Sequence, residues 1–407
     1  MVLNNIGQLL TMSGDGIGML RPGALRVADG LIVEVADHDL PVVPGETEVD
    51  CRGCVVLPGF VDPHTHPVFG GWRHDEFVMR LEGRSYKEIA QAGGGILSSV
   101  RTTRQASEQE LVESGKARVL EMLSWGTTTV EAKSGYGLDT ETELKMLRAI
   151  RRVGEEVPVT VVPTFLGAHS IPKDCTKDRY IDVVIEEMMP RVAEENLAEF
   201  CDVFCEDFLF DADDSLRILE AGRRHGLLPK IHADEIGSSG GAEVAAEVGA
   251  VSAAHLLRPS DRGLEMMAEA GVIAELLPGT CFFLREDAKA PVAKMRKAGV
   301  TMALATDFNP GSSTLICQPM TVVFACLVYG MSVEEALRGV TVNAARALRR
   351  DSEVGTLEKD KAADILVTDL PDYRHLAYRV GHNPCRMVLK RGVIVVSSGS
   401  LVPARQT

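Results

Sequence analysis

The sequence predicts an α/β fold: a (β/α)8 TIM-like barrel with a small β-sandwich domain built from both chain ends. Three observations predict it. The middle of the chain alternates short apolar segments with amphipathic ones, which is the pattern of repeated βα units. Eight apolar segments can be counted there, the number that closes a parallel barrel. Both chain ends instead carry strand-like, turn-rich segments.

The two chain ends are expected to pair into one small β domain. Residues 1–54 should form its N-terminal part, because they hold short strand-like runs and show no helical period. Residues 351–407 should form its C-terminal part, where 355–367 and 387–396 read as strands with no helix between them.

Residues 55–350 are expected to form the barrel. Its strands are predicted at 55–61, 127–132, 157–165, 200–205, 228–232, 251–255, 272–277 and 301–306. Its helices are predicted at 108–123, 141–153, 179–192, 214–225, 241–248, 260–270, 288–298, 319–329 and 333–345. A doubly wound open sheet is the alternative, but no strand is followed by a GxGxxG loop.

Composition excludes several classes of protein. The apolar fraction of 45% and the charged fraction of 25% are typical of a soluble globular protein. A net charge of −15 argues against nucleic acid or an anionic membrane as partner. No apolar run approaches the length of about 20 residues that spans a bilayer, and the N-terminus lacks the basic start of a secretory signal. Nine cysteines, an odd number, fit reduced thiols and a cytoplasmic location.

The predicted strand ends carry most of the candidate chemistry, because active sites of such barrels lie at the C-terminal ends of the strands. Five of the ten histidines fall there: His64, His66, His169, His232 and His255. Glu235 follows the fifth strand and Asp307 the eighth. A single histidine is often a hydrogen-bonded core residue, but five on one rim indicate a functional site.

Three imidazoles and one carboxylate suit a metal site. The candidates are His64, His66, His232 and Asp307. His64 and His66 are two apart on a strand, so they point to the same side. Such a set fits a divalent ion such as zinc or iron and leaves a position for water, whose pKa the metal can lower to about 7. His255 and Glu235 then fit a general acid/base and a hydrogen-bonding group for the substrate.

This ligand pattern resembles the amidohydrolase superfamily. Its hallmark is His-x-His after strand one, histidines after strands five and six, and an aspartate after strand eight. Many members bind two metals bridged by a carbamylated lysine after strand four. This chain has Cys205-Glu206-Asp207 at that place, without a lysine, which favours one metal ion per subunit.

Longer motifs resemble the imidazolonepropionase family within that superfamily, over essentially the whole chain. They lie at 62–66, 69–73, 93–96, 133–138, 165–169, 232–235 and 306–312. One departure is His74, where similar enzymes usually carry an acidic residue beside the arginine at 73.

The resemblance implies a reaction and a set of contacts. The reaction is the metal-dependent hydrolysis of the cyclic amide of 4-imidazolone-5-propanoate to N-formimidoyl-L-glutamate in histidine degradation. The implied metal ligands are His64, His66, His232 and Asp307, with one divalent or trivalent ion, zinc or iron, in each subunit of a homodimer. The implied substrate and product contacts are Arg73, Tyr136, His169, Glu235, Asn309, Gly311 and Ser312.

Physical reasons agree with several of these assignments. The planar guanidinium of Arg73 can grip a carboxylate through two hydrogen bonds. Tyr136 follows two glycine-permitted turns and is expected on an exposed loop. His255 is expected to stabilise the oxyanion or accept the water proton, while Asp307 passes a proton to the leaving ring nitrogen and Glu235 holds the ring nitrogens. Exchanging these three roles would not contradict the sequence.

Two other functions stay open. A cytosine- or guanine-type deaminase shares the one-metal ligand set and the glutamate after strand five, but it releases ammonia. Arg73 favours a substrate with a carboxylate over a neutral base. A catalytically silent barrel that serves as a scaffold is the other alternative. Such proteins usually lose metal ligands, whereas all four candidates are present here.

Overall fold

The structure is a computed structural model that describes residues 1–84, 88 and 94–402. Position 93 of the motif at 93–96, and residues 403–407 of the expected C-terminal part, lie outside these residues. An eight-stranded parallel sheet forms the larger part, in the order β15-β14-β13-β12-β11-β10-β9-β8. Its strands are β8 (Phe60–Asp62), β9 (Thr127–Lys133), β10 (Thr160–Ala168), β11 (Phe200–Cys205), β12 (Leu228–Ala233), β13 (Ser252–His255), β14 (Ile273–Leu276) and β15 (Met302–Leu304).

The first and last strands of this sheet meet through the residues at their ends. The backbone N–H of Asp307 donates to the carbonyl of His64 at 3.1 Å. The carboxylate of Asp62 accepts from the backbone N–H of Thr306 at 3.1 Å and from its hydroxyl at 2.6 Å. The sheet therefore curls into a barrel, which confirms the predicted (β/α)8 architecture.

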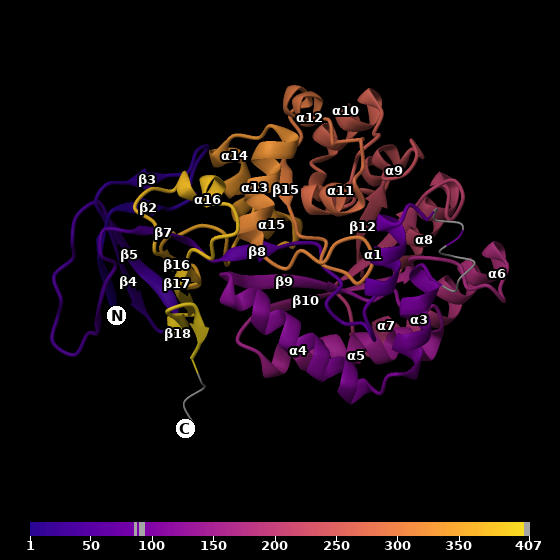
Figure 1. The fold of residues 1–407 in the computed structure, drawn as a ribbon, viewed down its shortest axis with the longest axis horizontal. Coiled ribbons are helices and arrows are strands. Elements are labelled where there is room, and N and C mark those ends of the chain that lie inside the picture. The colour runs from indigo at the N-terminus through magenta and orange to yellow at the C-terminus, as the bar shows by residue number, and fades with distance from the viewer. Residues whose placement is uncertain (85–87, 89–93, 403–407) are drawn as a thin grey trace.

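Helices cover the outside of the barrel (Figure 1). Those close to their predicted places are α4 (Glu108–Ser124), α5 (Thr140–Glu156), α8 (Ala212–Arg224), α9 (Gly241–Val248), α10 (Asp261–Ala270), α12 (Val292–Ala298) and α13 (Gln318–Tyr329). Local signals begin some of them. Ser107 accepts from the N–H of Glu110 at 3.2 Å, and the Glu110 carboxylate accepts from the N–H of Ser107 at 2.8 Å, which is a capping box at the start of α4.

Other helices differ from the prediction. The segment expected to form one helix at 179–192 forms three in succession: α6 (Lys177–Asp182), the π-helix η1 (Val183–Met188) and α7 (Met189–Glu194). The segment expected to form one helix at 333–345 forms two: α14 (Val333–Gly339) and α15 (Val342–Ala347). Within the described part of the barrel, three further helices were not predicted: α1 (His74–Leu81), α3 (Ile96–Gln105) and α11 (Pro278–Leu284). α1 and α11 have only 8 and 7 residues, so they offer few repeats of an apolar period. None of the helices in the described part of the chain is long and apolar enough to cross a membrane.

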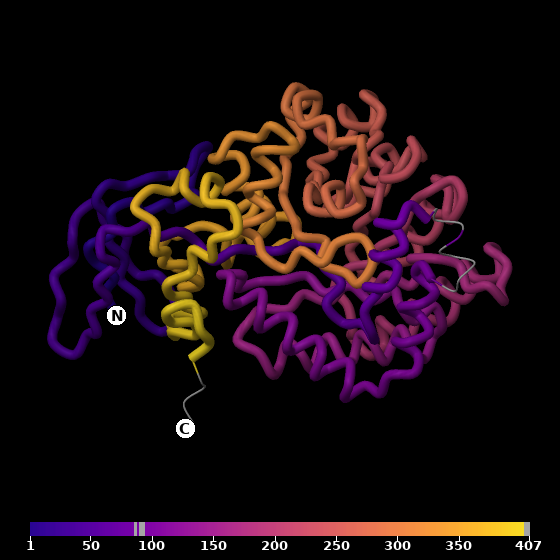
Figure 2. Tube along the Cα trace, viewed as in Figure 1, coloured from indigo at the N-terminus to yellow at the C-terminus, as the bar shows by residue number. Residues whose placement is uncertain are grey.

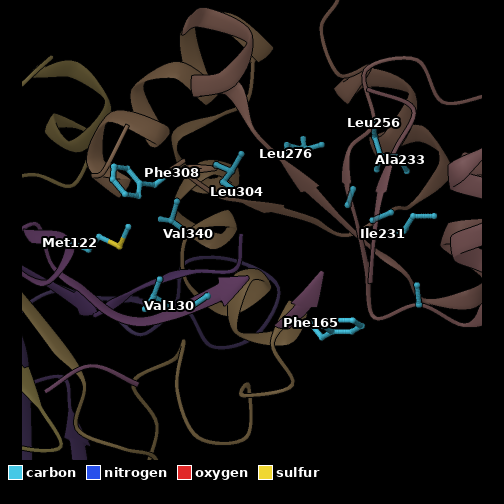
Figure 3. Close-up of a cluster of buried hydrophobic side chains, with 14 of the residues drawn as sticks. Met122, Val130, Phe165, Ile231, Ala233, Leu256, Leu276, Leu304, Phe308 and Val340 are labelled. Atoms are coloured by element: carbon cyan, nitrogen blue, oxygen red, sulfur yellow. The ribbon is translucent and has the colours of Figure 1, made fainter. Parts of the chain in front are cut away.

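The main core lies between the barrel strands and their helices. Figure 3 shows part of it, including Val130 of β9 and Ile231 of β12. Because successive strand residues face opposite sides, the neighbours of these two, Glu131, Lys230 and His232, point into the barrel. The inside of the barrel can therefore carry the chemistry while its outside carries the packing.

The small β domain contains strands from both chain ends, which lie side by side in Figures 1 and 2. A four-stranded sheet has the order β5-β4-β1-β6, and a seven-stranded sheet has the order β19-β18-β17-β16-β7-β2-β3. These strands are β1 (Val2–Ile6), β2 (Gln8–Leu10), β3 (Met19–Leu20), β4 (Gly23–Ala28), β5 (Leu31–Ala36), β6 (Glu48–Asp50), β7 (Val55–Pro58), β16 (Ile365–Thr368), β17 (Cys385–Lys390), β18 (Val393–Ser397) and β19 (Ser400–Leu401). Apolar side chains such as Leu25, Val56 and Ile365 pack between the two sheets, as expected of a sandwich.

The single strand expected at 55–61 was wrong. The chain forms β7, which pairs with β16 and β2 of the sandwich, and then β8, which pairs with β9 of the barrel. Gly59 separates them, and a Cβ there would lie 2.5 Å from the side chain of Thr128. Apolarity runs through both strands because both are buried, so the pattern could not show where one sheet ends and the next begins.

The absence of a helix between the C-terminal strands was also wrong. One short helix, α16 (His375–Tyr378), lies between β16 and β17. It is a single turn, so no periodicity could reveal it.

Candidate active site

The ends of β8 and β15 bring two histidines and one aspartate together. His64 Nε2 lies 3.6 Å from Asp307 Oδ1, and His66 Nε2 lies 3.7 Å from the same oxygen. One candidate ligand atom from each of the three residues lies within 4.8 Å of the others. All three side chains are buried.

A second group shares His64 with the first. The ring nitrogens of His64, His232 and His255 also fall within 4.8 Å of one another. The ring centroids of His64 and His232 are 4.5 Å apart, and those of His232 and His255 are 5.3 Å apart. The four expected metal ligands are therefore divided between two groups that share His64. His255, which was expected beside the metal and not as a ligand, belongs to the second group.

The donor atoms fit a metal ion. His64 Nε2 and His66 Nδ1 are buried and have no hydrogen-bond partner among the described residues, a costly state for a polar atom unless something else binds it. Burial lowers the pKa of both imidazoles well below the usual value, and neighbouring cationic groups lower it further. Neutral imidazole is the form that ligates a metal.

Asp307 is oriented by a residue that sequence reasoning missed. The hydroxyl of Thr280, on α11, donates to Asp307 Oδ2 at 2.7 Å, which leaves Oδ1 to face the two imidazoles. Burial raises the pKa of Asp307 to about 6. Asp307 and His255 have φ values of 51° and 68°, in the left-handed region that non-glycine residues seldom adopt. Backbone strain of this kind clusters at functional sites.

His255 and Glu235 lie next to each other, as their expected roles require. Nδ1 of His255 is 3.4 Å from Oε1 of Glu235. Burial raises the pKa of Glu235 well above its usual value, and the charge of Asp307 raises it further. Burial lowers the pKa of His255, with a further contribution from His232. The two shifts favour a proton on the Glu235 carboxyl over one on the His255 imidazole, and this makes the pair a candidate for general acid/base catalysis.

Aromatic rings line the side of the site near β9 and β10. His66 and His169 stack with centroids 5.3 Å apart and an interplanar angle of 14°, and the ring of Tyr136 is 5.4 Å from His169. His169 Nδ1 lies 3.0 Å from the carbonyl of Gly135. Tyr136 is only 3% exposed, so its expected place on an exposed loop was wrong.

A buried carboxylate explains the position of that tyrosine. Glu143 accepts from the backbone N–H groups of Gly135, Gly137 and Leu138 at 2.9, 2.7 and 2.9 Å. The loop after β9 is thereby folded back over the barrel end, and it carries Tyr136 into the site. Glu143 lies in α5, and the sequence did not single it out because a glutamate in a helix usually lies on the solvent-exposed face.

Arg73 is already paired within the chain. Glu76 Oε2 accepts from Arg73 Nε at 2.9 Å and from Nη2 at 2.7 Å, while Glu76 Oε1 accepts from the N–H of Gly95 at 3.0 Å. The remaining Nη1 lies against Gly311, where a Cβ would be only 1.9 Å away. Glu76 therefore binds one edge of the guanidinium, and Nη1 on the other side packs against Gly311.

Asn309, Gly311 and Ser312 form one turn after β15. Asn309 Oδ1 accepts from the N–H groups of Gly311 and Ser312, both at 2.8 Å, and its Nδ2 donates to the Ser312 hydroxyl at 2.8 Å. Next to this turn is a cavity of about 310 Å³ whose lining includes Arg73, Arg80 and Gly311. The structure thus places Arg73 and this turn, two parts of the expected substrate site that lie far apart in the sequence, against each other.

Two further carboxylates contact the histidines from inside the barrel, and sequence reasoning missed both. His64 Nδ1 lies 3.2 Å from Glu275 Oε2, and His232 Nδ1 lies 3.1 Å from Asp202 Oδ1. The available signal was a charged residue within a predicted apolar strand, since such residues are buried only when paired.

Comparison with protein families and curated relatives gives a consistent result. The amidohydrolase family matches residues 55–395. An imidazolonepropionase from Brevibacillus brevis is 47% identical over 418 aligned residues, which cover 98% of each chain. An imidazolonepropionase from Shouchella clausii is 51% identical over 370 aligned residues, covering 90% of this chain and 83% of that one.

Solved structures share the fold at low sequence identity. An atrazine chlorohydrolase from Arthrobacter aurescens, complexed with zinc, superposes with a TM-score of 0.74 at 17% identity, covering 99% of this chain and 96% of that one. A 5-methylcytosine deaminase from Klebsiella pneumoniae has a TM-score of 0.75 at 18% identity, covering 100% and 99%. At this identity the likeness concerns the architecture of barrel and sandwich.

Proposed function

Because the chain belongs to the amidohydrolase family and, within it, to the imidazolonepropionases, we propose that it hydrolyses the cyclic amide of 4-imidazolone-5-propanoate to N-formimidoyl-L-glutamate. One observation carries the proposal. The buried cluster of His64, His66 and Asp307 and the His255–Glu235 pair lie at the same end of the barrel. That arrangement combines a metal site with a proton-transfer pair, which hydrolysis of an unactivated amide needs.

The metal centre is proposed to hold one ion per subunit, divalent or trivalent, zinc or iron. Its ligands would be His64, His66, His232 and Asp307, and the partnerless Nε2 of His64, the nitrogen that faces Asp307, supports this set. When bound, the ion supplies a Lewis acid that makes a water molecule nucleophilic at neutral pH. His255 stands close enough to this set to serve as a further ligand or as a base.

Proton transfer is assigned to three side chains around the ring of the substrate. His255 accepts the proton of the attacking water or stabilises the oxyanion, and Glu235, 3.4 Å from His255, holds a ring nitrogen. Asp307, which offers Oδ1 to the metal site while its Oδ2 accepts from Thr280, is assigned to pass a proton to the leaving ring nitrogen. The ring then opens at the carbon–nitrogen bond of the amide.

The propanoate end is assigned to Arg73 and the turn beside it. Nη1 of Arg73 lies along Gly311, and the cavity there also contains Arg80, which donates to the Gly311 carbonyl at 3.1 Å. Two guanidinium groups suit a carboxylate better than a neutral base. Glu76 fixes Arg73 in place, so the substrate meets a preorganised cation. Tyr136 and His169 are proposed to contact the substrate opposite this end, and Asn309 and Ser312 to contact the product.

A homodimer in the cytoplasm is proposed as the working form, with no nucleic-acid or membrane partner. Large apolar side chains are exposed on and near α11, α13 and α16, among them Phe282, Leu327 and Tyr378. Exposed apolar side chains of this size are typical of protein interfaces. The nine cysteines form no disulfide, which suits a reducing compartment.

The decisive experiment follows the ultraviolet absorbance of the imidazolone on addition of purified enzyme and identifies the product. We expect loss of absorbance and N-formimidoyl-glutamate, without release of ammonia. Ammonia release from an aminated heterocycle, with no turnover of the imidazolone, would support a deaminase instead. Purified protein without stoichiometric metal after metal-replete expression would support a silent scaffold. His255→Ala with retained metal and near wild-type kcat would remove the role assigned to His255.

A further inference from the structure

Five charged side chains fill the inside of the barrel beneath the candidate metal centre. They are Glu131, Lys133, Asp202, Lys230 and Glu275, and each is at most 1% exposed. Barrels of this type usually fill the same space with branched apolar side chains. Burying a charge costs several kcal/mol unless it is paired and hydrogen-bonded. A cluster of this size therefore requires a continuous set of partners.

The contacts run without interruption from one proposed metal ligand to the other. Starting from His64, Glu275 contacts Nδ1 at 3.2 Å and Lys230 Nζ at 2.8 Å. Lys230 donates to Glu131 Oε1 at 2.8 Å, and Glu131 Oε2 lies 2.8 Å from Lys133 Nζ.

Lys133 continues the path to the second ligand. It donates to Asp202 Oδ2 at 2.7 Å, and Asp202 Oδ1 lies 3.1 Å from Nδ1 of His232. His64 and His232 are thus joined by five side chains, none of which reaches solvent.

The two end carboxylates each divide their oxygens between an imidazole and an ammonium group. Glu275 gives Oε2 to His64 and Oε1 to Lys230, and Asp202 gives Oδ1 to His232 and Oδ2 to Lys133. Neither carboxylate can rotate without breaking an ion pair. An ionised carboxylate only accepts, so each Nδ1 must carry the hydrogen, and the lone pair is left on Nε2, where a metal would bind.

We propose that Asp202 and Glu275 are positioning residues of the metal centre, and that Lys133, Glu131 and Lys230 couple them so that His232 and His64 are oriented as one unit. Carboxylate partners of metal-bound histidines fix ring orientation and tautomer. Coupling follows from the shared ammonium groups, because moving one carboxylate changes the ion pairs on which the other depends.

Glu131 joins the two halves of this network. Its Oε1 accepts from Lys230 at 2.8 Å and from the hydroxyl of Thr164 at 2.6 Å. Its Oε2 lies 2.8 Å from Lys133 Nζ as an ion pair and has no hydrogen-bond partner among the described residues, and the same is true of Glu275 Oε1 beside Lys230. The charges of the two lysines therefore compensate these buried oxygens.

The experiment measures metal affinity directly, so that it does not depend on turnover. Asp202→Asn, Glu275→Gln and the double variant are titrated with zinc against a competing chelator, and the d–d absorption spectrum of the cobalt(II) form reports ligand geometry. We expect each single variant to bind zinc about 10- to 100-fold more weakly, with an altered cobalt spectrum. The double variant should lose less than the product of the two single effects, since coupled residues are not additive.

A matched control separates positioning from general stability. Asp364 is also a buried, ion-paired carboxylate, with Oδ2 at 2.5 Å from Lys390 Nζ, but it lies in the small β domain. Asp364→Asn should lower thermal stability and leave the zinc affinity and the cobalt spectrum unchanged. Wild-type zinc affinity, within about twofold, in Asp202→Asn and Glu275→Gln would overturn the positioning role. A double variant equal to the product of the singles would overturn the coupling.

A second measurement, of the histidine tautomers, uses the wild-type protein and so does not depend on whether a variant folds. In zinc-loaded wild-type protein with 15N-labelled histidine, His64 and His232 should both be protonated at Nδ1, and protonation at Nε2 in either residue would overturn the assignment. The positioning role rests on the proposed metal ligands, and different results would contradict the positioning role and the ligand assignment. Wild-type protein that binds no metal would overturn both, whereas tight metal binding that is insensitive to Asp202 and Glu275 would overturn the inference alone.

Discussion

His64 and Glu275 are 211 residues apart in the chain, yet Nδ1 of the histidine lies 3.2 Å from Oε2 of the glutamate inside the barrel. The contact fixes which nitrogen of His64 faces Asp307, whose Oδ1 is 3.6 Å from Nε2. The proposed metal centre would therefore be oriented by carboxylates inside the barrel, while its ligands come from the strand ends.

Removal of the metal should abolish turnover and lower thermal stability. A ligand that binds only the folded state at about 1,000 times its Kd stabilises it by about 4.1 kcal/mol. Dialysis of wild-type enzyme against a chelator should lower Tm by several degrees, and added zinc or iron should restore both Tm and activity. The same treatment should not change the Tm of His66→Ala, which lacks one of the proposed ligands. An equal drop in both proteins would show that the chelator acts elsewhere.

Gly311→Ala should raise KM much more than it lowers kcat. The new Cβ would lie 1.9 Å from Arg73 Nη1, so the guanidinium must move away from the propanoate position. A tenfold rise in KM corresponds to about 1.4 kcal/mol of lost binding, and we expect at least that. Gly16→Ala is the control, since nothing lies within 4 Å of a Cβ at that position. An unchanged KM in Gly311→Ala would separate Arg73 from substrate binding.

Tyr136→Phe should weaken substrate binding while the protein keeps its stability. The ring packs near His66 and His169, at centroid distances of 5.8 and 5.4 Å, and phenylalanine preserves that packing. Loss of one hydrogen bond to a charged or polar substrate group costs about 1.5 kcal/mol, or roughly tenfold in KM. Steady-state kinetics and a thermal melt check the two halves of the prediction. Wild-type KM would assign the tyrosine to packing alone.

Thr306→Val should destabilise the barrel by about 1–3 kcal/mol, because a buried carboxylate loses a donor. The Thr306 hydroxyl donates to Asp62 Oδ2 at 2.6 Å across the seam between β15 and β8. Thr128→Val is a matched control, since the hydroxyl of Thr128 is buried without a hydrogen-bond partner among the described residues. Urea unfolding should place the control near wild type or above it. Equal midpoints for the two variants would contradict a role for this seam.

The metal-free protein should lose stability as the pH falls below 6.5, partly through His169. Burial and the neighbouring His232 lower the pKa of His169 from 6.5 to about 3. Between these values the unfolded chain binds a proton that the folded chain does not, so the free energy of unfolding falls by about 1.4 kcal/mol per pH unit from this residue. His169→Gln should show a shallower decline in urea unfolding between about pH 6.5 and about pH 5. Parallel pH profiles would show that His169 does not titrate as its burial implies.

Much of the architecture was accessible from patterns along the chain. Seven of the eight barrel strands, all except the first, and the helices α4, α5, α8, α9 and α10 lie close to their predicted places, because their apolar patterns are clear. The four-residue helix α16 was not predicted, since a single turn cannot show a period. The change from the sandwich to the barrel at Gly59 was not predicted for another reason: a buried strand has the same continuous apolar pattern in either sheet.

By itself, the sequence determined the residue types at the strand ends, and hence the histidines, Asp307 and Glu235 as candidates for one site. Only the tertiary structure decided how each candidate is held. Glu275 orients His64, Thr280 orients Asp307, and Glu76 already occupies one edge of Arg73. Periodicity along a chain reports which face of a strand or helix is buried, whereas these contacts join residues far apart in the chain or separated by a loop. Their partners are fixed only when the barrel closes and the buried charges must find one another.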